Sequence, residues 1–299
     1  MLSRRQLLLT PAALLALRTA EAADGKMTLA LHQNTSARAG FRPSLEGWAK
    51  AGITQVEITN NLLDEFLKTD SLAAARRVLT DLGLKAVSGS CGVGGLIEPN
   101  PNRAISLDRF KQRCEIWASL GLTQLYSTTA SMIKPTADDY KAAADNLREV
   151  GEVARQFQQT AMFEFVRTST FASTLTTLLS ITRAAAHPNA GVLFDCYHFW
   201  SGLNKLEDMD TLRPGEIKHV HFQDVPDMPR EMLDTTTRVI PGDGVTPLTA
   251  ILRKLAEKGY AGPLSVELFL PKFQHGDSFE VAREIKAKSE AVMRRAMVL

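Results

Sequence analysis

Four stretches of this sequence place an ionisable side chain at or near the end of an apolar run. They read Met162-Phe163-Glu164-Phe165-Val166, Leu193-Phe194-Asp195-Cys196, His219-Val220-His221-Phe222 and Ser265-Val266-Glu267-Leu268. A charged group in an apolar strand is costly to bury unless a partner compensates it. The candidate metal ligands are Glu164, Asp195, His221 and Glu267. Three carboxylates with one imidazole suit one divalent ion such as Mn²⁺, Mg²⁺ or Co²⁺ better than Zn²⁺, whose structural sites favour cysteine.

Three further polar residues accompany these candidates. His219 and His221 are two positions apart and point to the same side of a strand. His221 lies nearer the carboxyl end and is the better ligand, whereas we expect His219 to be a hydrogen-bonded core histidine. His32 and Glu57 end two earlier strands and are candidates for substrate binding. The alternatives are a solvated loop histidine for His32 and, for Glu57, a pair with a neighbouring base.

Strand and helix patterns alternate along the chain. The expected strands are Met27–His32, Gln55–Thr59, Lys85–Ser90, Gln124–Ser127, Ala161–Val166, Gly191–Asp195, His219–Gln223 and Leu264–Phe269. The expected helices are Ser71–Leu82, Leu107–Leu120, Ala137–Gln158, Ser173–Ala186, Leu248–Lys258 and Phe279–Met297. Eight such units predict an α/β fold, a single (β/α)₈ TIM barrel, whose active site forms at the carboxyl ends of the strands. A doubly wound sheet is the alternative, but no G-x-G-x-x-G follows a strand.

Composition excludes several classes of protein. The chain has 299 residues, of which 44% are hydrophobic and 23% charged, and a formal net charge of +2. This composition excludes disorder and a polytopic membrane protein. A nearly neutral chain also lacks the basic surface that binds nucleic acid or an anionic membrane. We leave the oligomeric state open, a homo-oligomer included.

The amino terminus is typical of an export signal. Arg4 and Arg5 precede an apolar run that ends at Leu17, and Ala20-Glu21-Ala22 follows. We predict a twin-arginine signal over residues 1–22, a barrel over residues 23–299 and a periplasmic or exported protein. The apolar run is too short to span a hydrocarbon core of about 30 Å. The alternative is a frayed helix with chance arginines.

Cys91, Cys114 and Cys196 have no metal-site spacing, and we expect buried thiols.

From Glu164 to Glu267 the sequence resembles the xylose isomerase-like TIM barrels of the sugar isomerase and epimerase superfamily, which include the abasic-site endonucleases. The matching stretches are Phe163-Glu164-Phe165, Phe194-Asp195-Cys196-Tyr197-His198, His219-Val220-His221-Phe222-Gln223-Asp224, Arg238-Val239-Ile240-Pro241-Gly242-Asp243-Gly244 and Gly259-Tyr260-Ala261-Gly262-Pro263-Leu264-Ser265-Val266-Glu267. The resemblance implies the same four metal ligands. It also implies that Glu164 and Glu267 transfer protons, and that His198 and Arg238 bind substrate oxygens.

One departure from the family argues against nuclease activity. The endonucleases hold two or three metals with additional histidines, placed in part before the glycine-rich turn after strand seven. This chain has Thr235-Thr236-Thr237-Arg238 there and six histidines in total. We interpret Pro241-Gly242-Asp243-Gly244 as a tight turn and not a phosphate loop, because no Lys-Ser/Thr follows it.

Three functions remain open at this point. The first is a metal-dependent isomerase or epimerase that moves a proton next to a carbonyl through an enediolate, acting on an unphosphorylated sugar or polyol ketone. The second is a lyase or dehydratase on a keto-sugar, a keto-inositol or a dehydroshikimate-like acid, which forms the same enolate. The third is a non-catalytic sugar-binding barrel, which would need neither Glu164 nor Glu267.

Overall fold

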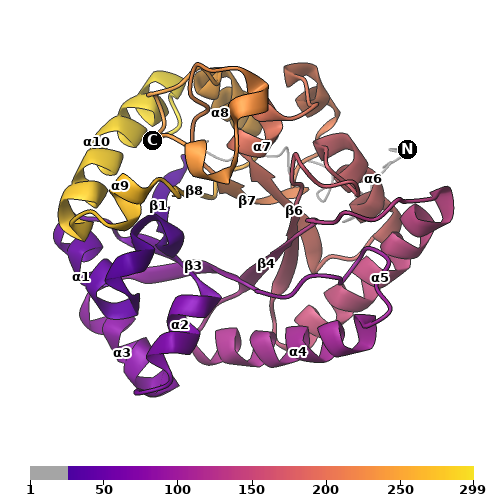
Figure 1. Ribbon diagram of the computed structural model, residues 1–299, viewed down its shortest axis with the longest axis horizontal. Helices are drawn as coiled ribbons and strands as arrows, with labels where there is room; N and C mark the ends of the chain where they lie inside the picture. Colours follow the sequence, from indigo (N-terminus) through magenta and orange to yellow (C-terminus); the bar gives the residue numbers. More distant parts are fainter. Residues whose placement is uncertain (1–25) are drawn as a thin grey trace, which may run out of the picture.

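The strands form one closed parallel barrel. The computed structural model describes residues 26–299. The eight strands pair in sequence order, and β8 closes on β1 (Figure 1). They are β1 (Thr28–His32), β2 (Gln55–Ile58), β3 (Lys85–Ser90), β4 (Gln124–Thr128), β5 (Thr160–Glu164), β6 (Ala190–Asp195), β7 (Ile217–His221) and β8 (Pro263–Val266). The expected single (β/α)₈ barrel is confirmed, and the export signal predicted over residues 1–22 lies outside the described residues.

Helices surround the barrel as an outer ring (Figure 1). The α-helices are α1 (Phe41–Lys50), α2 (Asn60–Phe66), α3 (Leu72–Asp81), α4 (Arg103–Ser119), α5 (Ala137–Gln156), α6 (Leu175–Ala185), α7 (Cys196–Ser201), α8 (Leu248–Glu257), α9 (Pro271–Gln274) and α10 (Ser278–Ala296). Short 3₁₀ segments are η2 (Gln33–Ala39), η3 (Leu206–Thr211), η4 (Arg230–Met232) and η5 (Thr235–Thr237). The six expected helices correspond to α3, α4, α5, α6, α8 and α10.

Three strands end earlier than the sequence pattern predicts. Strand β5 ends at Glu164, β7 at His221 and β8 at Val266, two or three residues before the expected ends. The residues beyond these ends include Phe165, Phe222 and Leu268, which are fully buried. An apolar run therefore continues from each strand into a buried loop, and apolarity alone does not mark the boundary. The three ligand candidates of these strands consequently lie at the very mouth of the barrel.

The core has an outer and an inner part. The outer part fills the space between the strands and the helices and contains the largest buried side chains, among them Trp48 and Trp117. Inside the barrel, Tyr126, Met162 and Leu193 form a separate small cluster. Buried polar side chains share this interior, including Glu57 and His219. The barrel is thus packed, and its interior carries charge.

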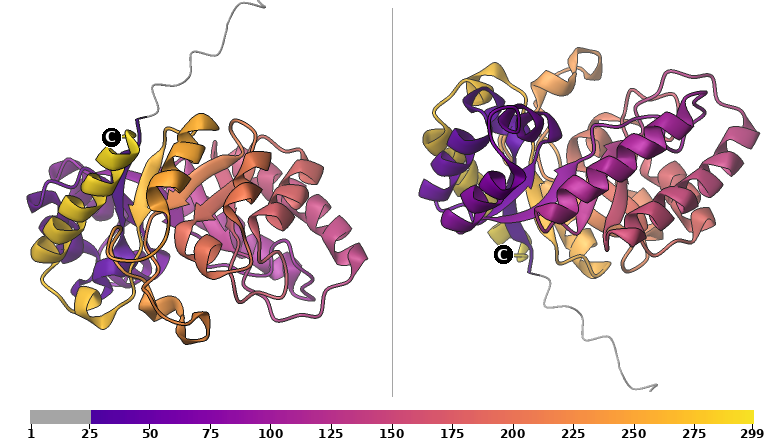
Figure 2. Two further views of the ribbon diagram at one scale, coloured as in Figure 1. Left: turned by 90° about the horizontal axis from the view of Figure 1, so that it is seen from above. Right: turned by 90° about the horizontal axis from the view of Figure 1, so that it is seen from below.

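The two ends of the barrel differ. At one end the described chain starts beside its carboxyl terminus, where the Met27 amide donates to the Val298 carbonyl at 2.5 Å (Figure 2). At the opposite end the segment after β7, which contains η4 and η5, projects from the body (Figure 2). Among residues 26–299, no helix combines the length and apolarity needed to cross a membrane.

Candidate metal and active site

The four expected ligands meet at the mouth of the barrel. Their nearest donor atoms all lie within 4.8 Å of one another. Strand register explains this, because Asp195 pairs with His221 across β6 and β7, and His221 pairs with Ser265, two residues before Glu267. All four residues are at most 4% exposed. The structure therefore brings the predicted set into one buried cluster.

Asp195 has a second task at the end of β6. The short helix α7 begins directly after it, and one Asp195 oxygen accepts a hydrogen bond from the His198 amide at 2.6 Å. The other oxygen accepts from Gln223 at 2.5 Å and from Arg238 at 3.3 Å. The carboxylate is thereby held with one oxygen on the helix and one in the cluster. Helix α7 is not among the helices expected from the sequence.

The ring of His221 lies between Glu57 and the three other carboxylates. Its Nδ1 lies 3.0 Å from a Glu164 oxygen and 3.6 Å from oxygens of both Asp195 and Glu267. Its Nε2 lies 3.3 Å from Glu57, on the inner side of the barrel. One ring nitrogen therefore faces the ligand cluster, and the other faces away from it.

Arg238 lies at the edge of the cluster and is 3% exposed. Its guanidinium donates to Glu267, to Asp195 and, at 3.0 Å, to Nε2 of His198. Since arginine can only donate, His198 accepts through Nε2 and is neutral there. Both residues for which the resemblance implies substrate binding, His198 and Arg238, therefore lie against the ligand cluster.

The loop that carries Arg238 is organised by Asp224. The Asp224 carboxylate, 1% exposed, accepts hydrogen bonds from the four backbone amides of Val225, Gly242, Gly244 and Thr246 at 2.9 to 3.1 Å. Asp224 and Val239 also exchange backbone hydrogen bonds. The glycine-rich stretch is a turn around this carboxylate, as interpreted from the sequence. The backbone pairing of Asp224 with Val239 holds the adjacent Arg238 in place.

His32 and Glu57 are both fully buried. Nδ1 of His32 accepts from the Asn34 amide at 3.1 Å, and its Nε2 lies 2.9 Å from the Tyr126 hydroxyl and 3.6 Å from Glu267. His32 is thus not a solvated loop residue. Glu57 lies 2.9 Å from Nε2 of His219. This contact agrees with the alternative in which Glu57 pairs with a neighbouring base. It also agrees with the expectation that His219 is a hydrogen-bonded core histidine.

The shared burial of these groups perturbs their protonation. Burial raises the pKa of Glu164 to about 8, although His221 opposes the shift. Burial alone would lower the pKa of His221, but Glu57, Glu164 and Glu267 outweigh it and hold that pKa well above its usual value. Burial would likewise raise the pKa of Asp195, but Arg238, His198 and His221 together outweigh it and keep that pKa well below the usual range. Without a metal ion, the cluster therefore retains protons on His221 and Glu164 near neutral pH.

A cavity of about 450 Å³ opens over the cluster. Glu164, Glu267, His198 and Arg238 line it, whereas His32 and Glu57 are not among the lining residues. The remaining polar lining is neutral and consists of Asn34, Thr59, Asn60, Asn61, Ser90, Tyr126, Ser127, Thr128 and Thr235. The cavity thus combines two carboxylates, one paired cation and many hydroxyl and amide groups.

Two residues at this site were not predicted from the sequence. Tyr126 lines the cavity beside His32, and Asn34 donates to Glu267 at 3.0 Å. A tyrosine in the middle of the fourth strand was a usable signal, since buried tyrosine hydroxyls need a partner. Asn34 lies in η2, just after β1, where a short polar segment gave no comparable signal.

The residues present fit a divalent metal ion. The donor set is three carboxylates and one imidazole, all buried and mutually close, with a single buried guanidinium among the described residues to offset their charge. Hard oxygen donors with one imidazole suit Mn²⁺, Mg²⁺, Co²⁺ or a catalytic Zn²⁺. Glu164, Asp195, His221 and Glu267 would hold the ion.

Comparisons with known proteins agree with this architecture. Residues 45–289 match the family model described as a xylose isomerase-like TIM barrel. An inosose isomerase of Bacillus velezensis is 26% identical over 265 residues, which is 87% of this chain and 94% of the relative. A 3-dehydroshikimate dehydratase of Pseudomonas putida is 27% identical over 77% of this chain, but the match spans only 36% of that longer protein.

Solved structures share the fold. The crystal structure of the IolI protein with a bound zinc atom superposes with a TM-score of 0.85 at 23% identity, over 91% of this chain and all of that one. The structure of an L-ribulose 3-epimerase gives a TM-score of 0.75 at 20% identity, over 91% of this chain and 96% of that one.

Proposed function

The chain belongs to the xylose isomerase-like TIM barrel family, and we propose that it is a metal-dependent isomerase or epimerase of an unphosphorylated polyol ketone or sugar. The observation that carries the proposal is the pair Glu164 and Glu267, which join the ligand cluster and also line the cavity. Relatives named inosose isomerase and a fold neighbour named L-ribulose 3-epimerase support the same class of reaction.

The reaction requires a proton to leave a carbon next to a carbonyl and to return at a new position or face. Glu164 and Glu267 come from β5 and from the end of β8, so two carboxylates reach the cavity from different strands. One removes the proton and the other returns one. When bound, the divalent ion supplies Lewis-acid stabilisation of the negative charge on the substrate oxygens.

Arg238 and His198 orient the substrate in this scheme. Arg238 keeps its charge, because Asp195 and Glu267 outweigh the effect of burial and raise its pKa. It can therefore hold an oxygen that becomes negative without losing a proton. Burial lowers the pKa of His198 to about 4, so its ring is neutral, and it lines the cavity, where we expect it to contact a substrate hydroxyl.

A dehydratase is the second candidate, since two relatives are named 3-dehydroshikimate dehydratase. The charges in the cavity favour the first candidate. Arg238 is the only lysine or arginine among the described residues that line the cavity, and it already pairs with Asp195 and Glu267. A dehydroshikimate-like acid would bring another carboxylate with no lysine or arginine other than this paired one to meet it among the residues that line the cavity. A neutral polyol ketone has no such cost.

Solvent exchange tests the proposal. The protein is loaded with Mn²⁺ or Zn²⁺ and incubated in D₂O with neutral keto-inositols and ketoses, and products are followed by NMR and mass spectrometry. We expect deuterium at one carbon with the molecular formula otherwise unchanged. Loss of one water from the product would instead indicate the dehydratase, and no exchange with any substrate would refute both enolising reactions.

Two variants make the test specific for the carboxylate pair. Glu267→Gln is expected to slow exchange by about 100-fold or more, because an amide cannot take up the proton. Glu216→Gln is the matched control: Glu216 pairs with Arg183 immediately before β7, at the opposite end of the barrel. Metal content is measured for both, since Glu267 is also a ligand candidate. Unchanged exchange in Glu267→Gln would remove Glu267 from the mechanism.

A further inference from the structure

Glu57 lies inside the barrel, out of reach of the cavity, yet it faces the imidazole of a ligand residue. We propose that Glu57 is a positioning residue that fixes His221 in one tautomer, with Nδ1 free to bind the metal ion and with Nε2 carrying the proton. The inference rests on the proposed metal centre and goes beyond it, because it assigns a task to a residue that touches neither ion nor substrate.

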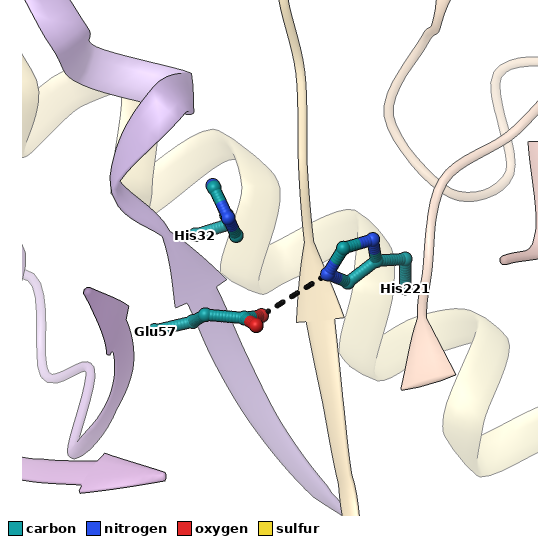
Figure 3. A group of neighbouring side chains, drawn as sticks. All are labelled: His32, Glu57 and His221. Atoms are coloured by element: carbon teal, nitrogen blue, oxygen red, sulfur yellow. Dashed lines mark ion pairs between the residues drawn. The ribbon is translucent and has the colours of Figure 1, made fainter. Parts of the chain in front are cut away.

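The geometry at His221 carries the proposal. Around Nδ1, oxygens of Glu164, Asp195 and Glu267 lie at 3.0, 3.6 and 3.6 Å, so this nitrogen faces the whole carboxylate cluster. On the other side of the ring, Nε2 lies 3.3 Å from Glu57 (Figure 3). An imidazole that binds a metal through one nitrogen offers its other N–H to a carboxylate or carbonyl in most metal sites. Glu57 is the carboxylate in that position, at ion-pair distance from Nε2.

Glu57 is itself held in place by a second histidine. Nε2 of His219 lies 2.9 Å from the same Glu57 oxygen, and His219 precedes His221 by two residues on β7. Within residues 26–299, neither a lysine nor an arginine forms an ion pair with Glu57, which is fully buried. A buried carboxylate needs hydrogen-bond donors. His219 hydrogen-bonds to Glu57, and the buried Nε2 of His221, which has no hydrogen-bond partner among residues 26–299, lies 3.3 Å away as the second donor within reach.

A second metal ion at His32, Glu57 and His221 is the competing interpretation, since their donor atoms also lie within 4.8 Å of one another (Figure 3). The hydrogen bonds of His32 argue against it. Its Nδ1 accepts the Asn34 amide, so its proton sits on Nε2, which faces Tyr126 and Glu267. Neither nitrogen of His32 then offers a lone pair to an ion beside Glu57. A second ion would also require His221 to give up both ring protons.

The first experiment uses the unaltered chain. The protein is labelled with ¹⁵N-histidine and loaded with Zn²⁺, and the ring nitrogens and protons of His221 are assigned by NMR. We expect a metal-bound Nδ1 and an Nε2–H proton that exchanges slowly with solvent and is hydrogen-bonded. A metal-bound Nε2, or a His221 ring without a proton, would overturn the proposal.

The second experiment removes the charge of Glu57. Loss of an outer partner of a ligand histidine commonly weakens metal binding by about 10- to 100-fold, and Glu57→Gln is expected to do so in chelator competition. Glu216→Gln, which removes a paired carboxylate at the other end of the barrel, is expected to bind Zn²⁺ like the wild type. Unchanged affinity of Glu57→Gln would overturn the positioning role.

Stoichiometry separates the remaining outcomes. One ion per wild-type chain and one per Glu57→Gln chain, held more weakly, supports the proposal. Two ions in the wild type and one in Glu57→Gln would make Glu57 a ligand and overturn it. No ion in the wild type would refute the proposed metal centre as well, whereas binding through the wrong nitrogen refutes this inference alone. If Glu57→Gln does not fold, the NMR measurement on the wild type decides.

Discussion

Asp224→Asn is the substitution that most directly tests how the loop that carries Arg238 is held. Each oxygen of Asp224 accepts two backbone amides: one oxygen takes Val225 and Thr246, and the other takes Gly242 and Gly244. An asparagine keeps one accepting oxygen but turns an NH₂ group toward the other two amides. Two hydrogen bonds are lost, and the NH₂ group of the asparagine then faces two backbone N–H groups, which are donors as well.

The expected loss of stability follows from those two bonds. Hydrogen bonds to a charged group contribute about 1.5 to 3 kcal/mol each, which gives roughly 3 to 6 kcal/mol for the pair. Gly242 and Gly244 are partly exposed and can turn to water, so we expect the free energy of unfolding to fall by about 2 to 4 kcal/mol. The same loop carries Arg238, so the rate of solvent exchange should fall as well.

Urea unfolding and deuterium exchange measure the two effects on one variant. Asp243→Asn is the matched control, because it makes the same chemical change in the same turn on an exposed side chain that pairs with Lys288. We expect that control to change stability by no more than about 0.5 kcal/mol. If Asp224→Asn unfolds at the wild-type urea concentration, the four amides do not depend on the carboxylate, and the account of the loop is wrong.

Three further predictions follow from the structure. The apparent affinity for Zn²⁺ or Mn²⁺ should rise as the pH increases from about 6 to about 9. The reason is that an entering ion displaces protons from His221 and from Glu164, whose pKa is about 8. A pH-independent affinity in chelator competition would contradict this. Gly244→Ala should destabilise the fold by about 1 to 3 kcal/mol, since a Cβ there would lie 2.2 Å from the Val225 carbonyl oxygen. Gly94→Ala is the control and should leave stability unchanged, because a Cβ there meets no atom within 4 Å. Urea unfolding curves compare the two variants. The free thiols of Cys91, Cys114 and Cys196 are buried, and burial raises the pKa of Cys91 to about 12. A thiol reagent near neutral pH should therefore label these cysteines only after denaturation. Fast labelling of the native chain would refute their burial.

The barrel and its ligand cluster could be predicted because both depend on features that are local in sequence. An ionisable residue at the end of an apolar strand is visible without a structure, and the order of strands in a barrel places Glu164, Asp195, His221 and Glu267 along one arc. The depth of His219 followed from its position two residues before His221 on one strand. These predictions needed only periodicity and the usual location of a barrel site.

The environment of Glu57 could not be predicted in the same way. Glu57 and His219 are 162 residues apart and meet only because the barrel closes across its interior. A strand-end glutamate can face the mouth or the interior, and the sequence left both options open. Asp224 is a similar case, since its four partners come from its own neighbour and from a turn about 20 residues later. Contacts of this kind depend on how the loops fold back.

The charges at this site argue for an ion better than any single distance does. Four buried carboxylates, those of Glu57, Glu164, Asp195 and Glu267, face one buried guanidinium, that of Arg238, among the described residues. Burying so many like charges is unfavourable for folding, and apolar replacements would often be neutral or more stable. Protons on His221 and Glu164 offset part of the excess in the metal-free protein, and a divalent ion would offset it while releasing them. The same excess of negative charge is unfavourable for an anionic substrate, so the proposed metal centre and the proposed preference for a neutral polyol ketone have one electrostatic origin.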